Sequence, residues 1–85
     1  MKQFTYTITD ELGIHARPAG LLTKAAAGFA STITLDSGVK KGDAKKIMSV
    51  MMLGIKQGQT VTVTAEGPDE EAAAAAMETF MKENL

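Results

Sequence analysis

The chain has 85 residues, a length that predicts a single domain over residues 1–85. Nine residues are basic and ten are acidic, and the formal net charge of −1 predicts no overall attraction to nucleic acid or to an anionic membrane. Cysteine is absent, which excludes disulfides, thiolate metal ligands and thiol nucleophiles and fits a reducing cytoplasm. No segment approaches the roughly 20 apolar residues of a membrane span, and the N-terminus lacks the apolar run of a signal peptide, so we expect a cytoplasmic protein with no membrane insertion.

The first predicted elements are a strand and a helix. Apolar side chains alternate with threonines in residues 4–9, which predicts a strand with one apolar face. In residues 16–27 the apolar residues recur at helical spacing. Pro18 is tolerated only in the first turn of a helix, because it has no N–H to donate and clashes with a preceding turn. The helix is therefore expected to begin at His15 or Ala16.

Two further strands and a short helix are expected in the middle of the chain. Residues 31–36 show the same alternation of apolar and threonine side chains. Residues 39–43 predict a weaker strand, in which Lys40 and Lys41 suit the edge of a sheet. The link between these two strands is short enough for an antiparallel hairpin. Residues 47–53 then predict a helix that is apolar nearly all the way round.

The last predicted elements are a strand at residues 59–66 and a helix that follows Asp69. Asp69 is a favourable N-cap residue, and the acidic residues after it suit the positive end of the helix dipole. The expected apolar face of this helix consists of Ala73, Ala76, Met77 and Phe80.

The element order βαββαβα indicates the fold class. Three of the strands alternate apolar and threonine side chains, whereas a sheet buried on both faces would read as continuous apolar runs. One face of the sheet is therefore expected in water and the other under all the helices. The prediction is an α+β, two-layer open-faced β-sandwich with a four-stranded, mostly antiparallel sheet and three helices on one face.

His15 and Arg17, the only histidine and the only arginine of the chain, lie at the start of the first predicted helix. The positive end of the helix disfavours an imidazolium, so we expect His15 to be mostly neutral, with a lone pair free to act as nucleophile. The backbone N–H groups of Ala16 and Arg17 can bind a phosphate, and the Arg17 guanidinium can bind its oxygens in a forked geometry. Together these features predict a histidine that accepts a phosphoryl group.

Several alternatives to this interpretation exist. The plain one is a surface or capping histidine. A metal site is disfavoured, because a lone histidine beside an arginine and without cysteine is a poor ligand set. No glycine-rich phosphate loop occurs, so we expect no nucleotide site and no cofactor, and the phosphoryl group must come from one protein and pass to another.

The helix predicted at residues 47–53 indicates a contact surface. Ser49 is its only polar residue. Ile47, Val50 and Leu53 share a spacing that can face the sheet, which leaves Met48, Met51 and Met52 partly exposed for adaptable contacts with partner proteins. Ordinary core packing of these methionines is the alternative.

Two motifs resemble one family. Gly-Ile-His-Ala-Arg-Pro-Ala at residues 13–19 is similar to the active-site motif of the HPr family, the histidine-containing phosphocarriers of the bacterial sugar phosphotransferase system. Lys-Ile-Met-Ser-Val-Met-Met-Leu-Gly at residues 46–54 resembles the regulatory helix of that family. The resemblance extends over the whole chain, including its length and element order.

The resemblance implies a role and a set of site residues. Such proteins take a phosphoryl group from enzyme I, which is charged by phosphoenolpyruvate, and pass it to the IIA domains of sugar permeases; they are carriers rather than stand-alone enzymes. His15 would be phosphorylated at Nδ1, and Arg17 with the Ala16 and Arg17 amides would hold the phosphoryl group. The residues implied to bind partners are Gly20, Met48, Ser49, Met51 and Met52.

Two positions depart from the family pattern. Gram-positive members carry a serine before Ile47 that a dedicated kinase phosphorylates, but here that position is Lys46, so this control is predicted to be absent unless Ser49 replaces it. Leu12 stands where some relatives have a side chain able to hydrogen-bond near the histidine.

Other functions remain open at the level of the sequence. A regulatory relative without catalysis would need the methionines but neither His15 nor Arg17. Anion or nucleic-acid binding through the lysines at positions 40, 41, 45 and 46 is disfavoured, because no aromatic residues lie among them and the chain is net acidic. A carrier that docks through one face is expected to be a monomer. The sequence does not indicate which sugars are carried downstream, or whether the role is in transport or in regulation alone.

Overall fold

The computed structural model describes residues 1–85 and has the predicted element order. The elements are β1 (Lys2–Thr7), α1 (Ala16–Ala27), β2 (Thr32–Asp36), β3 (Lys41–Asp43), α2 (Ile47–Met52), β4 (Thr60–Glu66) and α3 (Glu70–Asn84). The predicted helix start at residue 15 or 16 is confirmed. β1 begins two residues earlier than predicted, and β3 is shorter than its predicted range.

The four strands form one sheet in the order β1-β4-β2-β3, and every neighbouring pair is antiparallel. The predicted open-faced sandwich is therefore confirmed, with a sheet that is entirely rather than mostly antiparallel. β3 lies at the edge of the sheet, as its lysines predicted. Thr5 pairs with Thr62, and Thr34 pairs with Thr64, so the threonines of adjacent strands gather on one face.

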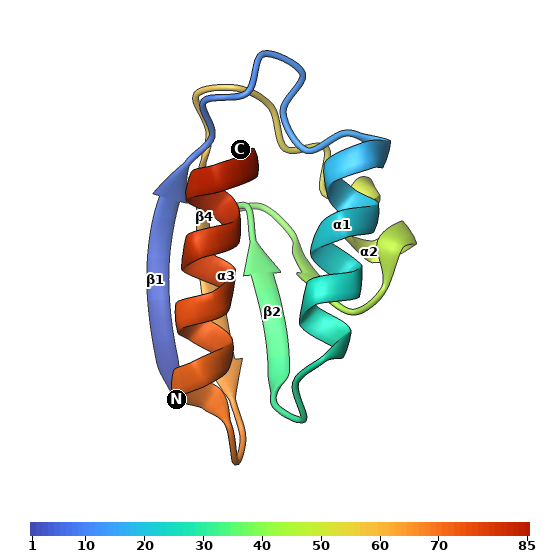
Figure 1. The fold of residues 1–85 in the computed structure, drawn as a ribbon. Helices are drawn as coiled ribbons and strands as arrows, with labels where there is room; N and C mark the ends of the chain where they lie inside the picture. The colour runs from blue at the N-terminus through green and yellow to red at the C-terminus, as the bar shows by residue number, and fades with distance from the viewer.

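The alternating burial along β4 shows why the helices form a layer on only one face of the sheet. Val61, Val63 and Ala65 are buried, whereas the threonines between them are partly exposed. Burial of one face and hydration of the other is what alternation with period two produces. Figure 1 shows α3 lying along β1 and β4, and α1 beside α3 over the other half of the sheet. The short helix α2 packs against α1 and β3.

The core lies between the helices and the sheet. Leu22 of α1, Val50 of α2 and Met77 of α3 are completely buried there. Most of the predicted apolar face of α3 is confirmed, because Ala73 and Met77 are buried and the half-buried Phe80 packs against the core. Ala76 is only half-buried, and the fully buried Met81 was not predicted. The predicted inward face of α2 is also partly wrong, because Ile47 remains 39% exposed at the end of a helix too short to be covered along its length.

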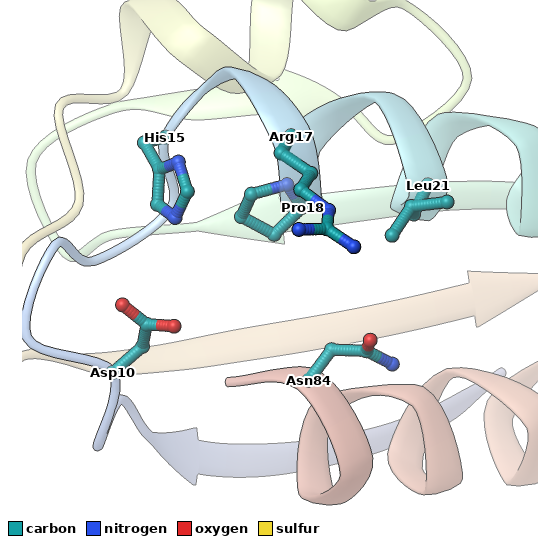
Figure 2. Close-up of a pocket in the computed structure, with 6 residues that line it drawn as sticks. All are labelled: Asp10, His15, Arg17, Pro18, Leu21 and Asn84. Atoms are coloured by element: carbon teal, nitrogen blue, oxygen red, sulfur yellow. The ribbon is translucent and has the colours of Figure 1, made fainter.

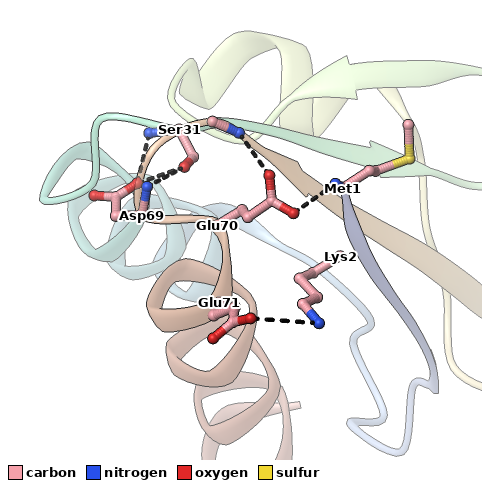
Figure 3. A network of polar contacts seen from close by, with 7 residues as sticks. Met1, Lys2, Ser31, Asp69, Glu70 and Glu71 are labelled. Carbon is pink, nitrogen blue, oxygen red and sulfur yellow. Dashed lines mark hydrogen bonds and ion pairs between the residues drawn. The ribbon is translucent and has the colours of Figure 1, made fainter.

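Asp69 stands at the N-cap position of α3, but its side chain makes no capping hydrogen bond. Its carboxylate instead accepts hydrogen bonds from the backbone N–H groups of Ala30, at 2.9 Å, and Ser31, at 2.8 Å. The Ser31 hydroxyl also donates to it (Figure 3). The predicted capping role of the side chain is therefore wrong, since tertiary donors outcompete the helix N–H groups. Asp69 joins the start of α3 to the start of β2.

Candidate functional site

Gly13 fixes the loop that leads to His15. Its φ is +65°, and a Cβ atom at this position would lie 2.3 Å from the carbonyl oxygen of Ile55 and 2.7 Å from Lys56 Cα. The next residue, Ile14, donates its N–H to the same Ile55 oxygen at 3.0 Å. Only glycine tolerates both the backbone conformation and the close approach. The loop before α1 is thus pressed against the loop before β4.

His15 is the N-cap residue of α1, with extended backbone angles and no side-chain capping bond. Its carbonyl oxygen accepts the N–H of Ala19 at 2.9 Å. The N–H groups of Ala16 and Arg17 have no acceptor within the protein, and Pro18 has no N–H. Two free donors therefore lie beside the imidazole at the positive end of α1, which is the arrangement that binds an anion.

The side chains of His15 and Arg17 line the same open pocket, with a volume of about 220 Å³. Figure 2 shows its other walls. They are Asp10 from the loop after β1, Pro18 and Leu21 from α1, and Asn84 from the last turn of α3. The pocket is large enough for a phosphate group, and Arg17 is its only cation. The structure thus brings His15 and Arg17 together at one pocket, whereas Ala16 does not line it and offers only its backbone N–H at the helix start.

Asp10 and Asn84 were not predicted as pocket residues. Asn84 is 67 or more residues from His15 and Arg17 in the sequence, so only the packing of α3 across the sheet brings it to the pocket. Asp10 lies in a segment that reads as an ordinary loop. An acidic residue shortly before the histidine was the one local signal that could have drawn attention to it.

The exposed side of α2 carries the methionines singled out in the sequence. Met48 is 66% exposed, Met51 41% and Met52 68%, while Val50 on the opposite side is buried. The prediction that these methionines are partly exposed is confirmed. A Cβ atom on Gly20 would lie 3.7 Å from Ile47 Cδ1, so Gly20 lies where α1 and α2 meet.

Ser49 lies next to Met52 on α2, on the side toward β3. It is half-buried and lines a shallow depression of about 410 Å³ together with Lys40, Lys41, Met52 and Leu53. The structure therefore separates Ser49 from the pocket that contains His15.

Lys46 is the N-cap residue of α2. Its backbone is extended, with φ −121° and ψ 113°, and its side chain is exposed and makes no capping bond. Its carbonyl oxygen accepts the N–H of Val50 at 3.1 Å. A serine would fit this backbone and could cap the helix, whereas lysine places a cation at the positive end of the dipole.

No three His, Cys, Asp or Glu side chains are grouped so as to hold a metal ion. None of the helices combines the length and the apolar character needed to cross a membrane.

Comparison with known proteins identifies the family. The family model described as the phosphorylation site of the HPr component of the phosphotransferase system matches residues 2–83. The chain is 43% identical to the phosphocarrier protein HPr of Mycoplasma capricolum over 81 residues, which cover 95% of this chain and 91% of that protein. It is also 43% identical to HPr of Mycoplasma genitalium, covering 99% and 97% of the two chains.

Solved structures show the same fold. The histidine-containing phosphocarrier protein of Mycoplasma superposes with a TM-score of 0.94 at 41% identity, over 96% of this chain and 93% of that chain. HPr from Thermoanaerobacter tengcongensis superposes with a TM-score of 0.92 at 42% identity, over 98% of this chain and 93% of that chain. A dimer of HPr from the same organism matches with a TM-score of 0.77 at 42% identity, over 98% of this chain and 95% of that chain. This chain belongs to the HPr family of phosphocarrier proteins of the phosphotransferase system.

Proposed function

We propose that this chain accepts a phosphoryl group on His15 from enzyme I, charged by phosphoenolpyruvate, and passes it to the IIA domains of sugar permeases. The observation that supports this most directly is the pocket at the start of α1. There His15 lies beside two backbone N–H groups without acceptors and shares the pocket with Arg17. An imidazole, two free donors and a guanidinium are the groups that phosphoryl transfer to histidine requires.

The transfer step follows from these positions. The lone pair on Nδ1 of His15 attacks the phosphorus atom of a phosphohistidine on enzyme I. As the new P–N bond forms, the P–N bond of the donor breaks, and its electron pair returns to the donor nitrogen. The N–H groups of Ala16 and Arg17 and the Arg17 guanidinium bind the phosphoryl oxygens, so that their charge is stabilised in place. The same step in reverse delivers the phosphoryl group to a IIA histidine.

One assay tests this function. The protein is mixed with enzyme I, magnesium and phosphoenolpyruvate, and the product is examined by mass spectrometry and by its stability to acid and base. We expect one phosphate that is labile in acid and stable in base, and that is absent from His15→Ala. A wild-type protein that gains no phosphate under these conditions would contradict the proposal.

The exposed side of α2 is the proposed docking surface for both partners. Met48, Met51 and Met52 provide its apolar part, and Gly20 lies beside it where α1 and α2 meet. Ser49 also belongs to the proposed partner-binding set, although it faces the depression next to β3. Flexible thioether side chains suit a surface that must fit two different proteins.

The remaining parts of the proposal concern regulation and assembly. Because Lys46 occupies the serine position of the Gram-positive relatives, serine phosphorylation does not control this protein. We further propose a carrier that is not itself an enzyme and that works in the cytoplasm as a single-domain monomer, although a relative forms a dimer. Sedimentation velocity would detect a dimer of this chain directly.

A further inference from the structure

Asp10 is the only carboxylate that lines the pocket of His15. Its backbone is fixed on both sides, because its N–H donates to the Leu85 carbonyl oxygen at 2.9 Å and its own carbonyl oxygen accepts the N–H of Gly13 at 3.0 Å. Its side-chain Oδ1 atom accepts the N–H of Leu12 at 2.8 Å. The second carboxylate oxygen, Oδ2, has no donor within the protein. The carboxylate is therefore held in place with one oxygen free.

The Asp10 carboxylate and the His15 imidazole line the same pocket. Figure 2 shows Asp10 across the pocket from His15, with one ring nitrogen near the start of α1 and the other directed toward the side where Asp10 lies. No direct hydrogen bond or ion pair joins the two side chains. Any effect of the carboxylate on the ring would therefore be exerted through its charge across the pocket, or through a water molecule between the two side chains.

Few other charges act at this place. Arg17 of α1 is the only other charged group that lines the pocket. The last turn of α3 contributes the neutral Asn84, whose amide donates to the Phe80 carbonyl oxygen at 3.1 Å. Glu11 beside Asp10 and Lys56 in the loop before β4 are exposed and do not line the pocket.

The chemistry of phosphohistidine gives this carboxylate a role. A lone pair on Nδ1 requires the ring proton to sit on Nε2. After transfer, the ring carries the phosphoryl group on Nδ1 and this proton on Nε2, and it is positively charged. Breaking the P–N bond then returns its electron pair to Nδ1 and releases a neutral imidazole. Without the Nε2 proton the leaving group would be an imidazolate anion, which is far poorer.

We propose that Asp10 is a positioning residue that keeps the proton on Nε2 of His15 both before and after phosphorylation. The inference rests on the proposed function. A negative charge that faces Nε2 favours the tautomer that can attack and also the protonated phosphohistidine that can donate. The phosphoryl group is held on the opposite side of the ring by the α1 N–H groups and Arg17. The repulsion between its oxygens and Asp10 therefore acts over a longer distance than the attraction between Asp10 and the Nε2 proton.

The test compares Asp10→Asn with Glu11→Gln. Both variants remove one negative charge from the same loop, but only the first removes it from the pocket. An asparagine keeps an oxygen that can accept the Leu12 N–H. Each protein is phosphorylated with enzyme I and phosphoenolpyruvate, and the phosphorus NMR signal of its phosphohistidine is followed against pH. The rate of transfer to a IIA domain is measured over the same pH range.

We expect the pH midpoint of the phosphorus signal to fall by about half a unit in Asp10→Asn, the order of effect that one nearby charge has through water. As the pH rises, the rate of transfer from Asp10→Asn to the IIA domain should begin to fall at a pH that is lower than in the wild type by the same amount. The midpoint should shift far less in Glu11→Gln, and in Asp10→Glu it should stay close to that of the wild type. Added salt should move the wild-type midpoint in the same direction as Asp10→Asn, because screening weakens the carboxylate's effect.

Equal midpoints in the wild type and Asp10→Asn would overturn the role of Asp10 while leaving the proposed function intact. If Asp10→Asn does not fold, a wild-type midpoint that is insensitive to salt would overturn it instead. Failure of the wild type to gain any phosphate would overturn the proposed function itself, so the two failures are distinguishable.

Discussion

At the scale of single residues, Arg17 is the only cation that lines the pocket of His15. It lies two residues after His15, in the first turn of α1, where a cation opposes the helix dipole. A bound phosphoryl group would offset this unfavourable interaction and could accept a forked pair of hydrogen bonds from the guanidinium. The unfavourable position of Arg17 is thus explained by the anion it is proposed to bind.

We expect Arg17→Ala to lower the rate of phosphoryl transfer from enzyme I by about 100-fold, the usual effect of removing one donor to a developing charge. Quench-flow measurements with phosphorylated enzyme I would give the rate. Lys24→Ala removes a cation from the last turn of the same helix, outside the pocket, and should leave the rate nearly unchanged. Equal losses in both variants would indicate only a general effect of charge.

Gly13 is a second residue on which the site depends, and Gly54 provides its control. The two have nearly equal φ values of +65° and +61°, but an added Cβ meets the Ile55 and Lys56 backbone at Gly13 and nothing at Gly54. We expect Gly54→Ala to lower the free energy of unfolding by about 1–2 kcal/mol through backbone strain alone. Gly13→Ala should cost clearly more, because two loops must also separate. Urea denaturation measures both, and equal costs would show that the contact is unimportant.

At the scale of elements, α2 combines a poor N-terminus with an exposed apolar side. Lys46→Ser would supply the missing cap and remove the cation from the helix start. We expect the free energy of unfolding to rise by about 0.5–1 kcal/mol relative to Lys46→Ala, which removes the cation only. Thermal and urea denaturation of the two variants would measure the difference.

The proposed absence of serine phosphorylation, which rests on Lys46, can be tested with the serine kinase of the Gram-positive relatives. After incubation with that kinase and ATP, mass spectrometry should find no added phosphate on the wild type and one on Lys46→Ser. A phosphate on the wild-type chain would contradict the proposed loss of control, and peptide mapping would then show whether Ser49 carries it.

The docking role of α2 can be separated from its role in folding. Met48 is 66% exposed, so Met48→Ala should change stability little. We expect it to raise the KM of enzyme I for this protein several-fold with a nearly unchanged kcat, the pattern of lost binding energy. Val39→Ala truncates a side chain that is 90% exposed in the turn after β2 and should leave KM unchanged. An unchanged KM in Met48→Ala would remove Met48 from the docking surface.

At the scale of the whole molecule, carboxylates at the start of α3 join distant parts of the chain. Hydrogen bonds from the Ser31 hydroxyl and from the Ala30 N–H hold the pKa of Asp69 below its ordinary value. The N-terminal ammonium, which contacts the side chain of Glu70 (Figure 3), and the Gly67 N–H lower the pKa of Glu70. α3 is thereby attached to the start of β2 and to the start of β1.

These shifts predict how stability depends on pH. A carboxyl whose pKa is lower in the folded than in the unfolded chain stabilises the fold above its unfolded pKa of about 4, and this stabilisation is lost as the pH falls through the folded pKa. Asp69→Asn should therefore lower Tm most at neutral pH, and its deficit against the wild type should shrink as the pH falls below about 4. Glu71→Gln removes an exposed pairing with Lys2 and one charge from the first turn of α3, and it should lower Tm less than Asp69→Asn at neutral pH. A deficit that is constant with pH would contradict this account.

The sequence by itself determined the order of the elements, which face of the sheet is exposed to solvent, and the position of His15 and Arg17 at a helix start. These features follow from local signals: alternation in the strands, helical spacing, and the restriction of Pro18 to a first turn. Only the tertiary structure decided that Asp10 and Asn84 complete the pocket and that Asp69 binds Ser31 instead of capping its own helix. Asn84 and Asp69 reach their partners from far along the chain, and Asp10 is held in place by a hydrogen bond to Leu85. No local periodicity or propensity encodes these contacts, because they form only when the elements pack.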